Sequence, residues 1–181
     1  MNGIVSGSKT KSILNPKLLG REGIPLWRRR LRESGRRLVV TNGCFDVLHV
    51  GHVRYLGEAR ALGDALLVLL NGDASVRELK GPGRPIHSAE DRAEVLGALA
   101  VVDAVVVFDT PRCDEWLRLV EPDIYAKGGD YTPETLDPAE RAALDACSAE
   151  IRILPLVPGR STTATIERMR GGSGGDEGGG R

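Results

Sequence analysis

Short apolar runs alternate with stretches of helical spacing along most of the chain. The apolar or β-branched runs lie at residues 37–40, 65–70, 103–108, 123–126 and 151–156. Between them, apolar residues recur every three or four positions, at 51–62, 74–79, 88–99, 114–120 and 138–146. Runs that are apolar at nearly every position are typical of parallel strands covered on both faces. The alternation therefore predicts an α/β fold, a doubly wound parallel sheet of about five strands with helices on both faces.

The segments outside this alternation follow other patterns. Residues 1–20 are polar and unpatterned, and residues 171–181 are mostly glycine, so we expect a disordered N-terminal arm and a disordered Gly-rich tail. Residues 21–36 combine a proline suited to a first helical turn with an apolar pair one turn apart, which predicts a docking helix. These boundaries leave residues 37–170 as the main domain.

The composition fits one soluble domain without a general attraction for a charged partner. The chain has 181 residues, a hydrophobic fraction of 41% and a formal net charge of zero. No segment reaches the ~20 apolar residues that a membrane-spanning helix needs, and the N-terminus has no signal-peptide core. Any anion site must therefore be local, because the balanced charge gives no global pull toward nucleic acid or anionic membranes. We expect a cytoplasmic protein that binds neither.

The cysteines favour neither disulfides nor zinc. Cys44, Cys113 and Cys147 are odd in number and widely spaced, which argues against a disulfide framework. Cys44 could join two histidines, His49 and His52, as three zinc ligands. Structural zinc takes four ligands, however, and no CxxC or further histidine pair supplies the fourth. We expect reduced thiols and no zinc.

The strongest chemical signal is the stretch TNGCFDVLHVGH at residues 41–52. It follows the first predicted strand and opens a helix, where unpaired backbone N–H groups and the positive end of the helix dipole favour an anion. His49 and His52 are three residues apart, so both side chains can lie on one face of the first turn. Gly51 between them lets a phosphate approach the backbone closely. The stretch predicts a turn that handles phosphate.

Three further segments at the carboxyl ends of predicted strands carry polar residues. They are the Gly- and Pro-rich loop 80–86, the glycine run 127–130, and the hydroxyl run 161–163. On their own, the loop would be a solvated connection and the hydroxyl run a simple helix N-cap. Ligands of doubly wound sheets bind at this edge. The sequence has no GxGxxG after a strand and no GxxxxGK[ST], so it indicates neither a dinucleotide oxidoreductase nor a P-loop kinase.

Six motifs in a fixed order resemble one family. They are TNGCFDVLHVGH at 41–52, RYLGEARALGD at 54–64, LKGPGRPI at 79–86, EDR at 90–92, KGGDY at 127–131 and GRSTT at 159–163. These motifs are similar to those of the cytidylyltransferase-like nucleotidyltransferases with an HxGH motif, and closest to the adenylyltransferase domain of ADP-heptose synthases. The resemblance covers residues 37–170 and implies a Rossmann-like nucleotidyltransferase domain. Bifunctional relatives carry a sugar-kinase domain ahead of it. We therefore expect a separate sugar kinase chain in the same pathway, and a homodimer stays open.

The resemblance also implies an activity and a set of site residues. The reaction would transfer AMP from ATP to a sugar 1-phosphate, heptose 1-phosphate in the closest relatives, and release pyrophosphate. The implied catalytic residues are His49, His52, Lys80 and Arg92, with the last two on the β and γ phosphates. The implied nucleotide-binding residues are Thr41, Asn42, Gly43, Cys44, Phe45, Gly51, Lys127, Gly128, Gly129, Asp130, Ser161, Thr162 and Thr163. Mg²⁺ would bridge the phosphates, and Asp46 is the candidate carboxylate partner.

No residue of such an enzyme needs to be a covalent nucleophile, because the phosphate oxygen of the acceptor attacks the α-phosphorus in line. Two alternatives stay open. One is a cytidylyltransferase acting on glycerol 3-phosphate or another alcohol phosphate, although the motifs LKGPGRPI and KGGDY favour an enzyme that acts on a heptose phosphate. The other is a nucleotide-sensing module, which need not keep groups useful only in a transition state. Gly72 departs from the family, which usually has Ser there, so any side-chain contact from that position is lost.

Overall fold

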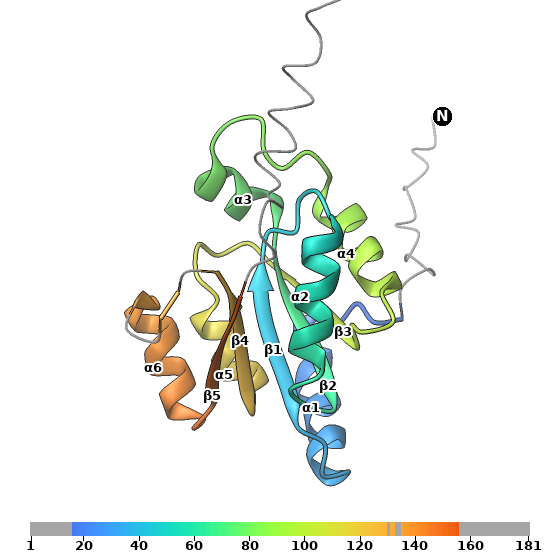
Figure 1. Ribbon diagram of the computed structural model, residues 1–181, viewed down its shortest axis with the longest axis vertical. Helices are drawn as coiled ribbons and strands as arrows, with labels where there is room; N and C mark the ends of the chain where they lie inside the picture. Colours follow the sequence, from blue (N-terminus) through green and yellow to red (C-terminus); the bar gives the residue numbers. More distant parts are fainter. Residues whose placement is uncertain (1–15, 130, 133–134, 156–181) are drawn as a thin grey trace, which may run out of the picture.

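Five parallel strands form one sheet in the order β3-β2-β1-β4-β5 (Figure 1). This is a computed structural model, and it describes residues 16–129, 131–132 and 135–155. The strands are β1 (Leu38–Gly43), β2 (Ala65–Asn71), β3 (Ala104–Phe108), β4 (Ile124–Gly128) and β5 (Glu150–Leu154). Every neighbouring pair is parallel. The predicted doubly wound, Rossmann-like α/β fold is confirmed.

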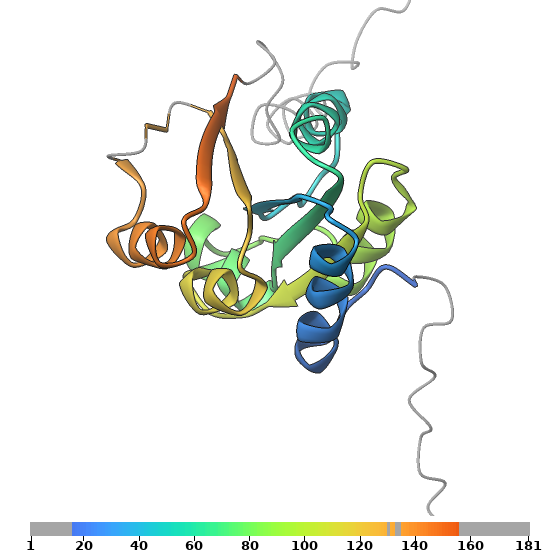
Figure 2. The same ribbon diagram turned by 90° about the horizontal axis from the view of Figure 1, so that it is seen from below.

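Helices cover both faces of the sheet, as Figure 2 shows from below. They are α1 (Ile24–Glu33), preceded by the 3-10 turn η1 (Arg21–Gly23), α2 (Val50–Arg60), α3 (Asp73–Lys80), α4 (Ala89–Ala98), α5 (Asp114–Val120) and α6 (Pro138–Ala146). One core contains residues of α1, α5 and α6, and the other contains residues of α2 and α4. Alternate residues of β2 enter opposite cores, Leu67 in the first and Leu66 in the second. Residues 65–70 of this strand are all apolar, which fits a strand buried on both faces.

Most predicted elements are present, and the clearest difference concerns β1. The apolar run at 37–40 predicted a short strand, yet the turn-prone residues Asn42 and Gly43 remain in the ladder, opposite Leu69 and Leu70 of β2. A fully buried neighbouring strand offers the backbone partners that override the local turn preference. Within the described ranges, no helix combines the length and the apolar surface that crossing a bilayer requires.

The N-terminal arm is attached to the sheet over its last residues. Leu18 forms a parallel bridge with Val105 of β3, and the Leu19 N–H donates to the Val105 carbonyl at 2.8 Å. This contact satisfies backbone groups of an edge strand that would otherwise face solvent. The expected disorder of residues 1–20 therefore does not extend to their described end, and the Gly-rich tail at 171–181 lies outside the described residues.

The shortest strand pairing of the sheet is between β1 and β4, the two strands at which the strand order reverses. These strands pair only through Val39 with Ile124 and Val40 with Tyr125, whereas β1 pairs with β2 at six positions. Beyond these two pairs, the hydroxyl of Tyr55 from α2 bridges the strands, 2.7 Å from Thr41 Oγ1 and 3.0 Å from the Ala126 carbonyl. Burial raises the pKa of Tyr55 to about 12, so this hydroxyl stays protonated. Parallel α/β sheets bind ligands at such a switch point.

Candidate active site

The two predicted histidines lie together at the start of α2. His49 is the N-cap, and its Nδ1 accepts the Gly51 N–H at 3.1 Å, while His52 Nδ1 accepts the His49 N–H at 3.3 Å. The two rings stack with their centroids 3.9 Å apart. Because each Nδ1 is an acceptor, each neutral ring carries its proton on Nε2 and can donate it to a ligand. The backbone cap thus fixes the tautomer as well as the position of both rings.

His52 is held in its neutral form. Burial, and next the neighbouring His49, lower the pKa of His52 to about 4. The Phe45 ring, 5.4 Å from the His52 ring between centroids, contributes to this apolar setting. At neutral pH the side chain is therefore a neutral hydrogen-bond donor rather than a cation.

A cavity of about 890 Å³ lies over the carboxyl ends of β1 and β4. This volume is in the range of sites that hold a nucleotide-sized ligand. The predicted residues that line it are His49, His52, Lys80, Asn42, Gly43, Cys44, Phe45, Gly51, Lys127, Gly128 and Asp46. Residues from β1, the start of α2, the end of α3 and β4 thus line one cavity.

Several predicted residues lie elsewhere. Thr41 is fully buried with its hydroxyl against Tyr55, so it faces the core instead of the cavity. Gly129 follows β4, and its N–H donates to the Leu154 carbonyl at 3.2 Å. The predicted nucleotide contacts of Asp130 and of Ser161, Thr162 and Thr163 fall outside the described residues.

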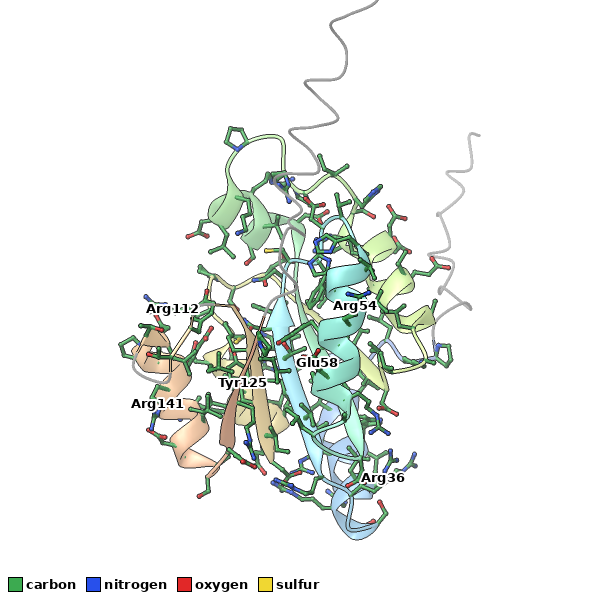
Figure 3. All side chains as sticks on the ribbon, in the orientation of Figure 1. Arg36, Arg54, Glu58, Arg112, Tyr125 and Arg141 are labelled. Atoms are coloured by element: carbon green, nitrogen blue, oxygen red, sulfur yellow. The ribbon has the colours of Figure 1, made fainter. Side chains whose placement is uncertain are left out.

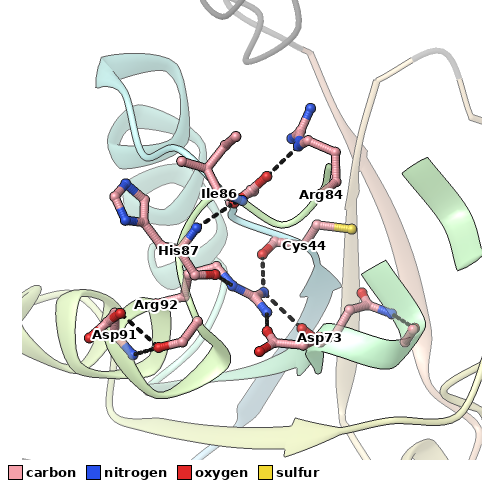
Figure 4. A network of polar contacts seen from close by, with 11 residues as sticks. Cys44, Asp73, Arg84, Ile86, His87, Asp91 and Arg92 are labelled. Carbon is pink, nitrogen blue, oxygen red and sulfur yellow. Dashed lines mark hydrogen bonds and ion pairs between the residues drawn. The ribbon is translucent and has the colours of Figure 1, made fainter. Parts of the chain in front are cut away.

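Arg92 does not line the cavity, in contrast to the expected phosphate contact. It is 2% exposed, and its guanidinium donates to three backbone carbonyls and one carboxylate (Figure 4). These acceptors come from the ends of β1 and β2, from the loop before α4 and from α3. A sequence reveals the charge of such an arginine but not the buried carbonyls that it satisfies.

Asp46 is likewise committed within the protein, although it was the candidate partner for Mg²⁺. It is 3% exposed, and its carboxylate accepts the backbone N–H groups of Ile86 at 2.7 Å and His87 at 3.2 Å. It also accepts a hydrogen bond from Arg84 Nε. With three donors already bound, this carboxylate is not an open metal ligand in the structure.

The opposite wall of the cavity consists of residues that the sequence analysis did not single out. Arg112 precedes α5 and pairs with Asp137, the N-cap of α6, at 2.9 Å. Glu140 of α6 is buried, with Lys127 Nζ 3.7 Å away. Arg112 and Tyr125 lie on the side of the sheet that carries β4 and α6 (Figure 3). No motif spacing in the sequence marks this wall.

Lys127 is connected to the histidine side through Asn42. The Asn42 Oδ1 accepts Lys127 Nζ at 2.9 Å and the Tyr125 hydroxyl at 2.8 Å. The same ammonium lies 5.0 Å from the centroid of the Tyr131 ring. These contacts place one positive charge on the cavity floor, between the two walls.

Gly72, which stands where the family usually has serine, leaves space for a neighbouring side chain. A Cβ at Gly72 would lie 2.0 Å from Oδ1 of Asp109, the residue after β3. Gly72 is also the N-cap of α3, without a side-chain cap bond. The Asp109 carboxylate therefore occupies the space in which the usual serine side chain would begin.

Two further observations concern the cysteines and the residues that could bind a metal. Cys44, Cys113 and Cys147 are free thiols, and burial raises the pKa of Cys44, which lines the cavity. Across residues 16–129, 131–132 and 135–155, no three His, Cys, Asp or Glu side chains gather closely enough to hold a metal ion. The described residues thus form no zinc site.

Known proteins resemble this chain in sequence and fold. The cytidylyltransferase-like family model matches residues 40–168. The chain is 51% identical over 138 residues to the bifunctional protein HldE of Syntrophotalea carbinolica, covering 76% of this chain and 28% of that protein. It is 53% identical over 144 residues to the protein of the same name from Methylococcus capsulatus, covering 78% and 30%.

A solved structure is also similar to this chain. The lipopolysaccharide core biosynthesis protein from Thermoplasma volcanium GSS1 matches with a TM-score of 0.56 and 29% identity, over 68% of this chain and 98% of that chain. The histidine pair at the switch point of the sheet lies within the residues that the family model matches. The chain belongs to the cytidylyltransferase-like family. It spans less than a third of the length of the curated relatives it matches.

Proposed function

We propose that the protein transfers AMP from ATP to a sugar 1-phosphate, heptose 1-phosphate in particular, with release of pyrophosphate. The observation that carries the proposal is the pair of stacked, backbone-capped imidazoles at the start of α2, inside a cavity of about 890 Å³. The choice of ATP and heptose 1-phosphate rests on the resemblance of the six motifs to the adenylyltransferase domain of ADP-heptose synthases.

The geometry supports direct in-line transfer. A phosphate oxygen of the acceptor forms a bond to the α-phosphorus of ATP, and the bond from that phosphorus to pyrophosphate breaks. His49 and His52 donate their Nε2 protons in hydrogen bonds to oxygens on which negative charge grows, and the N-terminus of α2 adds its backbone dipoles. Lys80, which ends α3 at the cavity, contacts the departing phosphates. The protein therefore acts by positioning and by charge stabilisation.

Mg²⁺ fits this reaction as a companion of the nucleotide. Mg²⁺ keeps several waters and binds mainly through substrate phosphates, so it needs few protein ligands. The described residues hold no cluster of three ligating side chains, and Asp46 is already bound by three donors. When present, the ion neutralises part of the phosphate charge. We assign it to the triphosphate rather than to a preformed protein site.

The second wall suits an acceptor that has both hydroxyls and a phosphate. Arg112 and Lys127 offer positive charge. Their partners Asp137 and Glu140 offer carboxylate oxygens that can accept hydrogen bonds from hydroxyl groups. A simple alcohol phosphate would use few of these groups. This arrangement supports a sugar phosphate over glycerol 3-phosphate.

The reaction also has requirements outside this chain. A sugar 1-phosphate must come from a phosphorylation reaction, for which we propose a sugar kinase carried by a separate chain. Because ATP and phosphorylated sugars are both substrates, we place the reaction in the cytoplasm. A homodimer is compatible with the proposal but is not needed for it.

Pyrophosphate release across four NTPs and a panel of acceptors tests the proposal. We expect turnover with ATP and heptose 1-phosphate, and no turnover by the double variant His49→Ala/His52→Ala, which controls for contaminating activity. Preferred turnover of CTP with glycerol 3-phosphate would establish the cytidylyltransferase alternative. Nucleotide binding without pyrophosphate release for any pair would indicate a sensing module.

A further inference from the structure

Two buried charges join the segment before α2 to the loop before α4. We call residues 44–49 the histidine turn and residues 80–87 the lysine loop. Asp46 belongs to the histidine turn, three residues before His49, and its side chain is 1% exposed. Its carboxylate accepts the N–H groups of Ile86 and His87 and the Nε–H of Arg84. All three donors belong to the lysine loop.

Arg92 joins the same segments from the side of α4 (Figure 4). Its Nη1 donates to the Cys44 carbonyl at 2.6 Å and to the Asn71 carbonyl at 2.8 Å. Its Nε donates to the His87 carbonyl at 3.0 Å, and its Nη2 to Asp73 Oδ1 at 2.8 Å. One guanidinium thus holds the histidine turn, the end of β2, the lysine loop and the first turn of α3.

These contacts hold only one end of the lysine loop. Gly81 and Gly83, with φ of 85° and 81°, separate Lys80 from the part that Asp46 and Arg92 hold. Lys80 itself is exposed and lines the cavity together with Arg84. Fixing residues 84–87 therefore limits how far Lys80 can move from the histidine pair.

We propose that Asp46 and Arg92 are positioning residues that hold the lysine loop on the histidine turn, so that Lys80 and the two imidazoles contact one phosphate chain. If the loop moved away, the Asp46 carboxylate would lose three hydrogen-bond donors, and the loss of hydrogen bonds to a charged group is costly. The lysine loop is therefore held against the histidine turn before the nucleotide binds. Such preorganisation favours the transition state more than the bound substrate. The proposal rests on the proposed function for the role of Lys80.

Asp46→Asn tests the proposal with little change in shape. Asparagine keeps an oxygen for Ile86 and His87 but loses the charge that faces Arg84. Asp103→Asn is the matched control, because Asp103 also accepts one arginine, Arg60 Nε at 3.0 Å, and one backbone N–H, that of Leu66 at 2.8 Å. Asp103 precedes β3, at the edge of the sheet opposite the cavity.

Two readouts need no substrate. In Asp46→Asn, the amide hydrogens of Ile86 and His87 should exchange about tenfold faster or more, because their acceptor is weaker and the loop leaves it more often. Trypsin should also cut faster after Lys80, located by the mass of the new fragments. The control should leave both rates within about twofold of the wild type. Unchanged exchange at Ile86 and His87 in Asp46→Asn would overturn the proposal.

Kinetics separate positioning from simple destabilisation. Asp46→Asn should lower kcat by about tenfold or more, with the KM for ATP within about threefold, at a temperature where both variants are folded. A loss of kcat equal to that of the Asp103→Asn control would reduce Asp46 to a structural role. Because the exchange and trypsin measurements are independent of turnover, a wild-type protein that releases no pyrophosphate would refute the proposed function without deciding the role of Asp46.

Discussion

The two walls of the cavity are built in different ways. On the histidine wall, backbone N–H groups fix both imidazoles, and buried charges fix the neighbouring loop. On the α6 wall, side chains pair with side chains, Arg112 with Asp137 and Lys127 with Glu140. A wall fixed by backbone suits a step that is common to all substrates of a family. A wall of paired side chains can change its specificity by substitution without altering the fold, so we propose that the histidine wall carries the chemistry and the α6 wall selects the acceptor.

The largest effect should come from the histidine wall. His52→Ala removes a preorganised donor, so we expect kcat to fall by about 10²-fold or more, while nucleotide affinity stays within a few fold. His49→Ala should behave similarly. Steady-state kinetics and nucleotide titration on the same samples measure both quantities, and near wild-type turnover of either variant would contradict the division between the walls.

Lys80→Ala should have the next largest effect, because Lys80 reaches the phosphates from a loop. We expect kcat to fall by more than the KM for ATP rises. Lys80→Arg should restore little activity, since a planar guanidinium does not reproduce a compact ammonium. An effect confined to KM would make Lys80 a binding contact only.

On the α6 wall, Asp137→Asn should raise the KM for the sugar phosphate by about tenfold and leave the KM for ATP nearly unchanged. Asparagine is also a good N-cap, so α6 should keep its start. Asp145→Asn is the control, because this carboxylate pairs with Arg141 on the exposed surface of α6. Equal changes in both KM values would show that the two walls do not divide the substrates.

The smallest expected effect is on the pH dependence of stability. The unfolded His52 binds a proton near its ordinary pKa of 6.5, whereas the folded residue does so only near 4. Between these values the unfolded state binds more protons, so stability is full above pH 6.5 and decreases as pH falls toward 4. The urea midpoint of the wild type, compared with His52→Gln, should therefore decline between pH 7 and pH 4.5. If the difference in urea midpoint between the wild type and His52→Gln stayed constant over this pH range, folding would not lower the pKa of His52.

Local sequence signals predicted the elements that they dominate. The bounds of α5 and α6 agree with their predicted ranges, 114–120 and 138–146, because apolar spacing marks both helices and Asp137 caps the start of α6. The histidine pair was also predicted, since its spacing alone sets both rings on one helical turn. These features depend on neighbours within a few residues.

Features that depend on distant partners were missed or misassigned. The sequence shows Asp46 and Arg92 as charges near a phosphate motif, but not that loop amides and carbonyls occupy them. Lys127 was predicted, but its neighbours Arg112, Asp137 and Glu140 on the α6 wall were missed, because these residues meet only after separate segments pack together. Asp130 and the hydroxyl run at 161–163 stay predictions.

The short pairing of β1 with β4 divides the sheet into two blocks of strands. Two residue pairs, the Tyr55 hydroxyl and the Asn42 side chain, which accepts hydrogen bonds from Tyr125 and Lys127, join the block β3-β2-β1 to the block β4-β5 beside the cavity. The histidine wall belongs to the first block, and the α6 wall, through α6 and β4, belongs to the second. The distance between the two walls therefore depends on these few contacts between β1 and β4, whereas the geometry within each wall depends on contacts inside its own block.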